Sequence, residues 1–228
     1  MKRNPYNFPF VVIEGIDGCG KSTLIEKLRQ WDERYHIGSI FTREPTHGKY
    51  GEKIRRILQN KGMDENGLFV DSCSLQELYF YDRLEHRRIE AVFLERYPVI
   101  SDRDFESSIA YGISEGVKPE WLFNRQEEIV SNNLFVSDLT IVLDVSAETA
   151  LERQLKAGKK LDYFEAELEK KKRIREAYLN LPRILTNFYN SSFQHNIQFI
   201  DASKMPDEIA DAAISLIQPI FEQKIGVL

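Results

Sequence analysis

The sequence predicts an α/β fold in which a parallel, five-stranded sheet is covered by helices on both faces. Short apolar runs alternate along the chain with longer segments in which apolar residues recur every three or four positions. A glycine-rich stretch directly follows the first apolar run and leads into the first helical segment. Because ligands of such folds bind beyond the carboxyl ends of the strands, residues at those ends are the first candidates for a functional site.

Three of the predicted strands lie in the first half of the chain. Phe10–Glu14 is a short run that stops at Gly15, as a buried strand does. Apolar residues at positions 24, 25, 28 and 31 predict a helix from Lys21. The other elements expected here are a strand over 39–45, a helix over 50–62, a long helix over 74–96 and a strand over 98–102.

The second half completes the alternation of strands and helices. Residues 139–145 form the most apolar strand, and Ser146 is suited to cap a helix that begins near Ala147. Residues 156–167 are a charged interruption, after which a long helix runs to about residue 181. The remaining elements expected are a helix over 120–135, a strand over 197–201 and a terminal helix from residue 206.

Composition limits the classes of function. The chain has 228 residues, enough for one well-buried α/β domain over 1–228 with a mobile lobe. Its net charge of −5 argues against a protein that binds nucleic acid through bulk positive charge. No stretch is long and apolar enough for a membrane span, and the first residues lack the apolar core of a signal peptide. Two cysteines, read as free thiols, favour a reducing compartment, so we expect the cytoplasm.

The glycine-rich stretch matches the phosphate-binding loop, or Walker A motif, G-x-x-x-x-G-K-[ST]. Its backbone N–H groups would hold phosphate oxygens of ATP, Lys21 would bridge the β- and γ-phosphates, and Ser22 would bind Mg²⁺. No Asn-Lys-x-Asp motif is present, which argues against a GTPase. The predicted ATP- and phosphate-binding residues are Gly15, Gly18, Cys19, Gly20, Lys21, Ser22 and Thr23.

Four stretches in this order resemble the thymidylate kinase family: EGIDGCGKST, TREPTHGKYGEKIR, ELYFYDRLEH and ISDRDFESSIAYG. The resemblance extends from about residue 10 to 220. It implies a P-loop kinase fold, a three-layer sandwich with a small lid at about 154–166. It also implies transfer of the γ-phosphoryl group of ATP to dTMP with Mg²⁺, which gives dTDP for dTTP synthesis, and a homodimer.

The resemblance also assigns roles to charged residues. It places Arg43 on the acceptor phosphate, Arg83 on the acceptor nucleotide, Arg103 on the transferring phosphoryl group and Asp102 in the magnesium–water network. Asp17 would contact the 3′-hydroxyl of the deoxyribose. Several charged side chains that meet at one point suit phosphoryl transfer, because catalysis of this reaction depends on positioning the two substrates and on neutralising their negative charge. The acceptor-binding residues implied are Asp17, Arg43, Glu44, Pro45, Tyr79, Arg83, Arg103, Ser107 and Tyr111.

The chain departs from the family in its catalytic arginines. Members usually carry one in the P-loop, where this chain has Gly18, or in the lid, where it has Ala157 and Tyr163. Lysine supplies charge without the planar fork of arginine, so we expect a slower enzyme or one in which a lysine takes over this role. The candidate replacements are Lys159, Lys160 and Arg153.

Departures around the base pocket keep other functions open. Phe80 and Tyr81 are bulkier than usual, Gly112 stands where glutamine is frequent, and Asp104 follows the Asp-Arg pair. One alternative is a kinase of the same fold that acts on dUMP or another nucleoside monophosphate. The other is a catalytically weak, nucleotide-binding regulatory protein.

Overall fold

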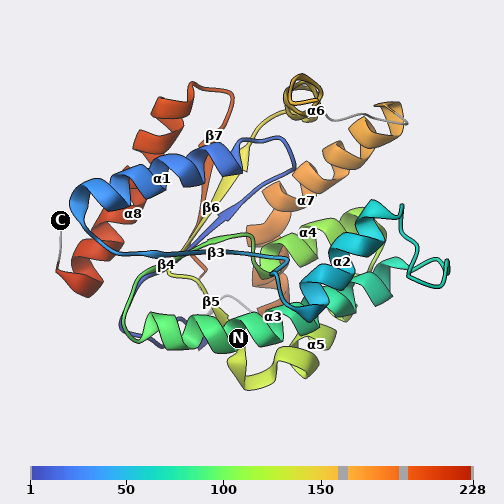
Figure 1. Ribbon diagram of the computed structural model, residues 1–228, viewed down its shortest axis with the longest axis horizontal. Coiled ribbons are helices and arrows are strands. Elements are labelled where there is room, and N and C mark those ends of the chain that lie inside the picture. The colour runs from blue at the N-terminus through green and yellow to red at the C-terminus, as the bar shows by residue number, and fades with distance from the viewer. Residues whose placement is uncertain (1, 159–163, 190–194, 227–228) are drawn as a thin grey trace.

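The computed structural model describes residues 2–158, 164–189 and 195–226. Its centre is a parallel, five-stranded sheet with the order β3-β4-β2-β6-β7 (Figure 1). The α/β class and the five predicted strands are therefore confirmed. The strands are β2 (Phe10–Glu14), β3 (Ile40–Arg43), β4 (Val99–Asp102), β6 (Leu139–Asp144) and β7 (Ile197–Asp201).

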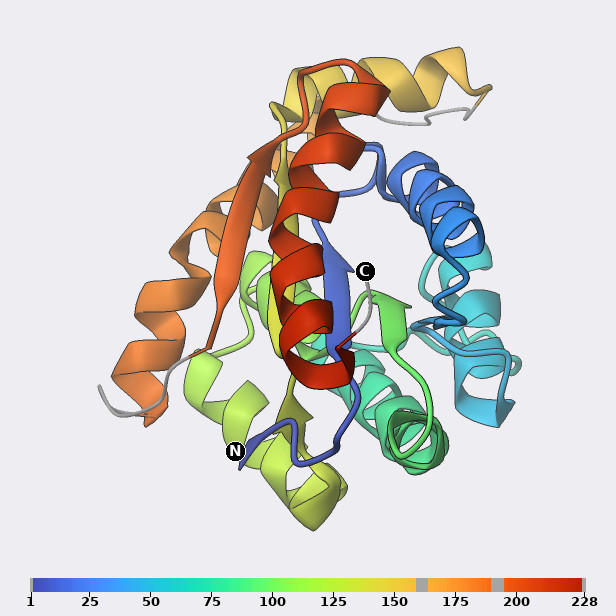
Figure 2. The ribbon, with the colours of Figure 1, turned by 90° about the vertical axis from the view of Figure 1, so that its left-hand side faces the viewer.

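Helices cover both faces of this sheet. α1 and α8 pack on one side, with α8 beside β7 in Figure 2, and α3, α4, α5 and α7 lie on the other. The helices are α1 (Lys21–Tyr35), α2 (Lys49–Gln59), α3 (Ser72–Leu94), α4 (Phe105–Ser114), α5 (Pro119–Val130), α6 (Ala147–Lys156), α7 (Phe164–Tyr189) and α8 (Pro206–Ile225).

Two expectations about helix ends were wrong, and one helix was missed. The helix over 120–135 ends at Val130, and a 3₁₀ turn (Ser131–Asn133) and the short strand β5 (Phe135–Val136) follow; β5 pairs with β1 (Lys2–Arg3). Helix α4 was not predicted at all. The helix expected to stop near residue 181 continues through Pro182 to Tyr189. A proline removes one backbone donor, but Leu181 and Leu185 on either side of it are buried in the core and hold the helix together.

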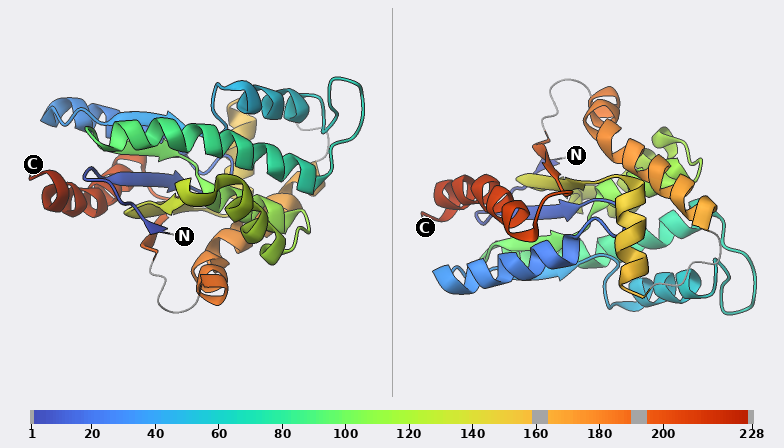
Figure 3. Two further views of the ribbon diagram at one scale, coloured as in Figure 1. Left: turned by 90° about the horizontal axis from the view of Figure 1, so that it is seen from below. Right: turned by 90° about the horizontal axis from the view of Figure 1, so that it is seen from above.

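The sheet brings the candidate residues to one edge. Every residue of β2 is buried, as expected for a central strand covered on both faces. Because all five strands are parallel, their last residues, Glu14, Arg43, Asp102, Asp144 and Asp201, share the carboxyl edge. Helix α6 lies beyond the end of β2 at this edge in the right-hand view of Figure 3. Among the described residues, no helix has both the length and the apolar character needed to cross a membrane.

Candidate active site

The loop between β2 and α1 wraps around the amine of its own lysine. Lys21 Nζ donates to the carbonyl oxygens of Gly15 at 2.9 Å and Ile16 at 3.4 Å. Gly18 has a φ of +92°, and a Cβ there would lie 2.3 Å from the carbonyl oxygen of Ala150 on α6. Only glycine fits this position, so the loop passes close beneath α6.

The first turn of α1, directly after the loop, is partly exposed to solvent. Ser22 and Thr23 are both exposed there. The N-terminus of a helix attracts anions through its free N–H groups and its dipole. The loop, Lys21 and this helix end together have the form of the predicted phosphate cradle.

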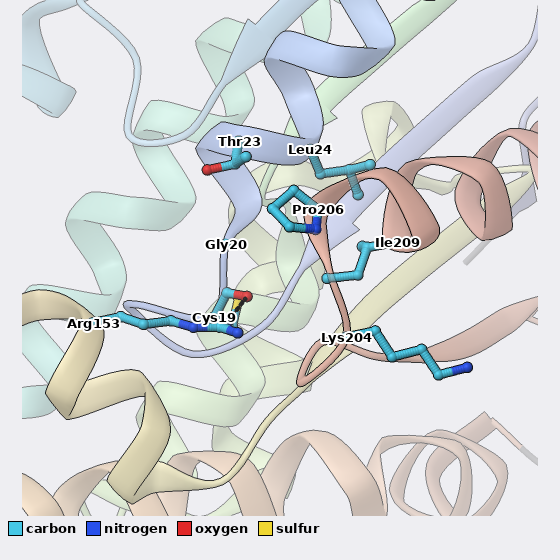
Figure 4. A pocket seen from close by; sticks show the side chains of 8 residues that line it. All are labelled: Cys19, Gly20, Thr23, Leu24, Arg153, Lys204, Pro206 and Ile209. Atoms are coloured by element: carbon cyan, nitrogen blue, oxygen red, sulfur yellow. Dashed lines mark hydrogen bonds between the residues drawn. The ribbon is translucent and has the colours of Figure 1, made fainter.

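A small cavity of about 120 Å³ adjoins the cradle between α1, α6 and α8 (Figure 4). Arg153 from α6 reaches into this region, where Nη1 donates to the Cys19 carbonyl at 3.1 Å and Nη2 to the Ala202 carbonyl at 2.9 Å. A largely apolar cavity beside a phosphate cradle suits the base of a nucleotide. The lining residues are Cys19, Gly20, Thr23, Leu24, Arg153, Lys204, Pro206 and Ile209.

Arg103, the residue directly after β4, reaches the P-loop. Its Nη2 donates to Asp17 Oδ1 at 2.5 Å and to the Tyr111 hydroxyl at 3.0 Å. Its Nη1 donates to Ser107 Oγ at 2.8 Å and to the Tyr178 hydroxyl at 3.1 Å. The P-loop, α4 and α7 therefore fix this guanidinium together, next to the cradle.

Glu14 lies behind Arg103 and is completely buried. Its carboxylate accepts from Ser107 Oγ at 2.7 Å, the Tyr178 hydroxyl at 2.8 Å and the Asp104 N–H at 2.8 Å. Burial raises the pKa of Glu14, although Arg103, 3.8 Å away, acts in the opposite direction. Glu14 thus anchors the hydroxyl groups that in turn hold Arg103.

Asp17 is the anion shared by three cations. Its side chain is 52% exposed, so its partial desolvation does little to raise the pKa of the carboxyl, and Arg103, Lys21 and Lys171 hold that pKa well below its usual range. Lys171, from α7, also donates to the backbone carbonyl of Asp17 at 3.0 Å. The tip of the P-loop is therefore an ionised carboxylate within a positively charged surround.

On the acceptor side, Arg43 and Glu44 differ sharply in environment. Arg43 is exposed, and its side chain makes no hydrogen bond or ion pair within the described part of the chain. Glu44 is buried; its Oε2 accepts from Arg83 Nε at 3.0 Å and Nη2 at 2.6 Å, and its Oε1 lies 3.2 Å from His86 Nδ1. Burial would raise the pKa of Glu44, but Arg83 and His86 lower it to about 2.

Arg83 is almost fully enclosed. Besides Glu44, its guanidinium contacts Gln126 Oε1 at 2.8 Å, Ser108 Oγ at 3.1 Å and Asp104 Oδ1 at 3.2 Å. These partners come from β3, α4 and α5 and their flanking loops, so Arg83 joins the acceptor-side elements into one network. Two opposite charges buried together are costly to separate.

The arginines do not pair with the carboxylates beside them in the sequence. Arg83 pairs with Glu44 rather than Asp82, whose carboxylate accepts instead from the N–H of Thr46 at 2.7 Å and its Oγ1 at 2.6 Å. Arg103 likewise pairs with Asp17 rather than with Asp102.

The aromatic residues of α3 take three different positions. Tyr79 is partly buried, and burial raises the pKa of its hydroxyl to about 12. Phe80 is in the core against Trp121, and Tyr81 stacks on Tyr50 of α2 with ring centroids 5.3 Å apart. The bulky pair that departs from the family pattern therefore packs in different directions, one ring inward and one against α2.

Two smaller features shape the same region. The carbonyl of Pro45 accepts from Arg55 Nη1 at 3.0 Å, which ties the turn after β3 to α2.

A Cβ on Gly112 would lie 2.8 Å from both methyl carbons of Leu122. A glutamine at position 112 would therefore require Leu122 to move.

Asp102 has the features of a cation-binding carboxylate. Its Oδ1 is buried and has no hydrogen-bond partner among the described residues. The register places it beside Ile13 of β2 and Arg43 of β3, at the carboxyl edge. Mg²⁺ is commonly held by one or two protein oxygens together with phosphate oxygens, so Asp102 and the exposed Ser22 fit this ion. The lid candidates Lys159 and Lys160 lie outside the described residues.

Comparison with known proteins identifies the family. The family model described as Thymidylate kinase matches residues 13–211. The chain belongs to the thymidylate kinase family. The probable thymidylate kinase of Methanococcus maripaludis is 32% identical over 220 residues, 93% of this chain and 98% of the relative. That of Thermococcus gammatolerans is 33% identical, with 84% and 91% covered, and the thymidylate kinase of Brachyspira hyodysenteriae is 30% identical, with 91% and 92% covered.

Three residues that hold Arg103 and the P-loop received no role from the thymidylate kinase motifs: Glu14, Lys171 and Tyr178. Glu14 was interpreted only as the end of a strand, and Tyr178 and Lys171 only as part of a helix. A carboxylate that ends an otherwise apolar strand was an available signal for Glu14. No signal in the sequence links it to Tyr178, because 164 positions separate the two.

Proposed function

We propose that this chain transfers the γ-phosphoryl group of ATP to dTMP, giving ADP and dTDP. Membership of the thymidylate kinase family supports this reaction. The structural observation that carries it is the contact between Arg103 and Asp17, which joins the acceptor-side arginine to the P-loop. A donor phosphate in the cradle and an acceptor beside Arg103 would meet at this contact.

The position of each residue in the site indicates its role on the donor or the acceptor side. P-loop N–H groups and Lys21 hold the donor phosphates, and Arg103 neutralises charge on the transferring phosphoryl group. Arg43, exposed at the end of β3, takes the acceptor phosphate. Arg83 belongs to the acceptor side and also fixes the Glu44 turn that carries Arg43. Transfer is direct, because the two phosphate sites adjoin and no nucleophilic side chain is needed between them.

Ser22 and Asp102 are the residues we assign to Mg²⁺, Asp102 through water. When bound, the ion supplies positive charge to the donor phosphates. Ser22 is exposed beside the cradle, and the unpartnered Oδ1 of Asp102 faces no competing donor within the described residues.

We propose further that residues 154–166 act as the lid of a single domain over 1–228. Arg153, directly before this segment, already touches the P-loop through the Cys19 carbonyl. Closing such a segment over the phosphates would exclude water, which otherwise competes as acceptor.

Two features of the surroundings complete the proposal. We place the enzyme in the cytoplasm, because Cys19 and Cys73 are both free thiols.

We also propose a homodimer formed through α2 and α3, where Leu58, Ile89 and Val92 are exposed. Light scattering after gel filtration would give a mass near twice that of the chain; a monomer would rule this out.

The reaction is tested by coupled ADP release with ATP and Mg²⁺. The acceptors are dTMP, dUMP, dCMP, dGMP, thymidine and none, and Arg103→Ala is the control. Turnover with dTMP that Arg103→Ala abolishes is the expected result. Turnover with another acceptor alone would change the assigned substrate. If no ADP is released with any acceptor although ATP still binds, the chain is not a kinase.

A further inference from the structure

Lys171 contacts the P-loop from a helix outside every motif of the sequence. Its Nζ donates to the carbonyl oxygen of Asp17 at 3.0 Å and lies 3.5 Å from the carboxylate of Glu167. It is one of three cations that lower the pKa of the Asp17 carboxyl, with Arg103 and Lys21. The contact joins α7 to the tip of the phosphate cradle.

The burial of Lys171 sets it apart from its neighbours. It is 2% exposed, whereas the side chains of Lys170 and Lys172 are 41% and 45% exposed and pair with surface carboxylates. Burying an ammonium group costs free energy that only well-placed partners offset. The three consecutive lysines therefore provide one buried group and two matched surface controls.

The contacted carbonyl belongs to the peptide group that joins Asp17 to Gly18. In a planar trans peptide the N–H points away from the C=O, so Lys171 turns the Gly18 N–H away from α7. That N–H has no acceptor among the described residues. Because Gly18 is a glycine with a φ of +92°, the peptide group could turn over at little cost unless something holds it.

We propose that Lys171 is a positioning residue of the phosphate site. It keeps the Asp17–Gly18 peptide group turned so that the Gly18 N–H remains available to the phosphate oxygens of a nucleoside triphosphate or diphosphate. In loops of this type the N–H groups line the inner, phosphate-binding side. The proposal rests on the proposed function for the identity of the donor, but the phosphate contact can be measured without turnover.

The test is Lys171→Met, which removes the charge and the donor but keeps a long side chain. Calorimetric titration with ADP is expected to show an affinity loss of about tenfold or more, the usual effect of losing one charge-assisted contact. The KM for ATP is expected to rise to the same extent, with kcat changing less than about threefold and dTMP affinity less than about twofold. Lys171→Arg restores ADP affinity, since it returns the charge and the donor.

Lys170→Met and Lys172→Met are the matched controls, and both are expected to bind ADP as the unmodified protein does. If Lys171→Met does not fold, Lys171→Gln replaces it, with a loss smaller than tenfold expected because an N–H donor remains. Unchanged ADP affinity in a folded variant, the same loss in either control, or equal losses for ADP and dTMP would each overturn the proposal. Absence of turnover in the unmodified protein would contradict the proposed function and leave the ADP comparison decisive for Lys171.

Discussion

Glu44 shows how ionised groups inside the protein support the acceptor side. Its carboxylate is buried and takes two hydrogen bonds from Arg83. Burial acts to raise its pKa, but Arg83 and His86 lower it from 4.5 to about 2. A carboxyl whose pKa is lower in the folded state stabilises the fold above its unfolded pKa, and this contribution is lost as the pH falls through the folded value.

We therefore expect Glu44→Gln to destabilise the protein most near neutral pH. The difference in unfolding free energy between Glu44→Gln and the unmodified protein should stay constant above about pH 5 and shrink between pH 4.5 and about 2. Urea unfolding across this range measures it. Glu52→Gln, which removes an exposed partner of Arg56, should show almost no difference at any pH. If the difference in unfolding free energy for Glu44→Gln were the same at pH 6 and pH 3, the pKa of Glu44 would not be lowered in the folded protein.

Single residues were predictable from the sequence wherever a motif fixes their spacing. Lys21 begins α1 after the glycine-rich loop, and Arg103 directly follows β4, as their motifs indicated. Their partners were not predictable, because burial and pairing depend on distances through space. Arg83 finds Glu44 across 39 positions and Arg103 finds Asp17 across 86. The roles assigned to these residues stay predictions.

At the scale of elements, α2 and α3 are joined by the stack of Tyr50 on Tyr81. These helices flank the turn that carries Arg43 and Glu44, so their spacing affects the acceptor side. We expect Tyr81→Leu to raise the KM for dTMP by several-fold and leave the KM for ATP unchanged, since such ring pairs contribute about 0.5–1.5 kcal/mol. Steady-state kinetics with each substrate varied in turn gives the two values.

The control for this stack is Tyr97→Leu, which changes an exposed tyrosine just after the end of α3. It should leave both KM values as they are. If Tyr81→Leu lowered only the melting temperature, or raised both KM values together, the stack would have no special part in placing the acceptor.

The elements were predicted well where one pattern dominates a segment. All five strands of the main sheet and the family were predicted correctly, and Ser146 caps α6 as expected by accepting from the Thr149 N–H. Local signals failed where packing decides the outcome. Pro182 suggests a helix end, yet the buried Leu181 and Leu185 keep α7 intact through it. α4 follows the Asp-Arg motif so closely that its residues were interpreted for chemistry rather than for periodicity.

At the scale of the whole molecule, the site depends on elements spread along the chain. β2 is the central strand of the sheet, and the groups around Arg103 come from the P-loop, α4 and α7. Ligands that bind only this assembled site must stabilise the entire fold. ADP at one hundred times its dissociation constant should raise the unfolding free energy by about 2.7 kcal/mol.

The same measurement separates the donor and acceptor sites. In Arg103→Ala we expect stabilisation by ADP to persist and stabilisation by dTMP to weaken, because Arg103 lies on the acceptor side of the cradle. Urea unfolding with each nucleotide alone records both values. Equal stabilisation of Arg103→Ala and the unmodified protein by dTMP would remove Arg103 from the acceptor site.

The contact between Arg103 and Tyr178 also bears on how the protein is made. The tyrosine lies 75 positions after the arginine, so a ribosome adding roughly 5–20 residues per second completes the pair only seconds after Arg103 is synthesised. During that interval the buried carboxylate of Glu14 also lacks the hydroxyl of Tyr178. A nascent chain halted before α7 therefore carries the P-loop and the motifs of Arg43, Arg83 and Arg103 without a finished site. Products that end before α7 should consequently be inactive, because Tyr178 and Lys171 are missing from the site.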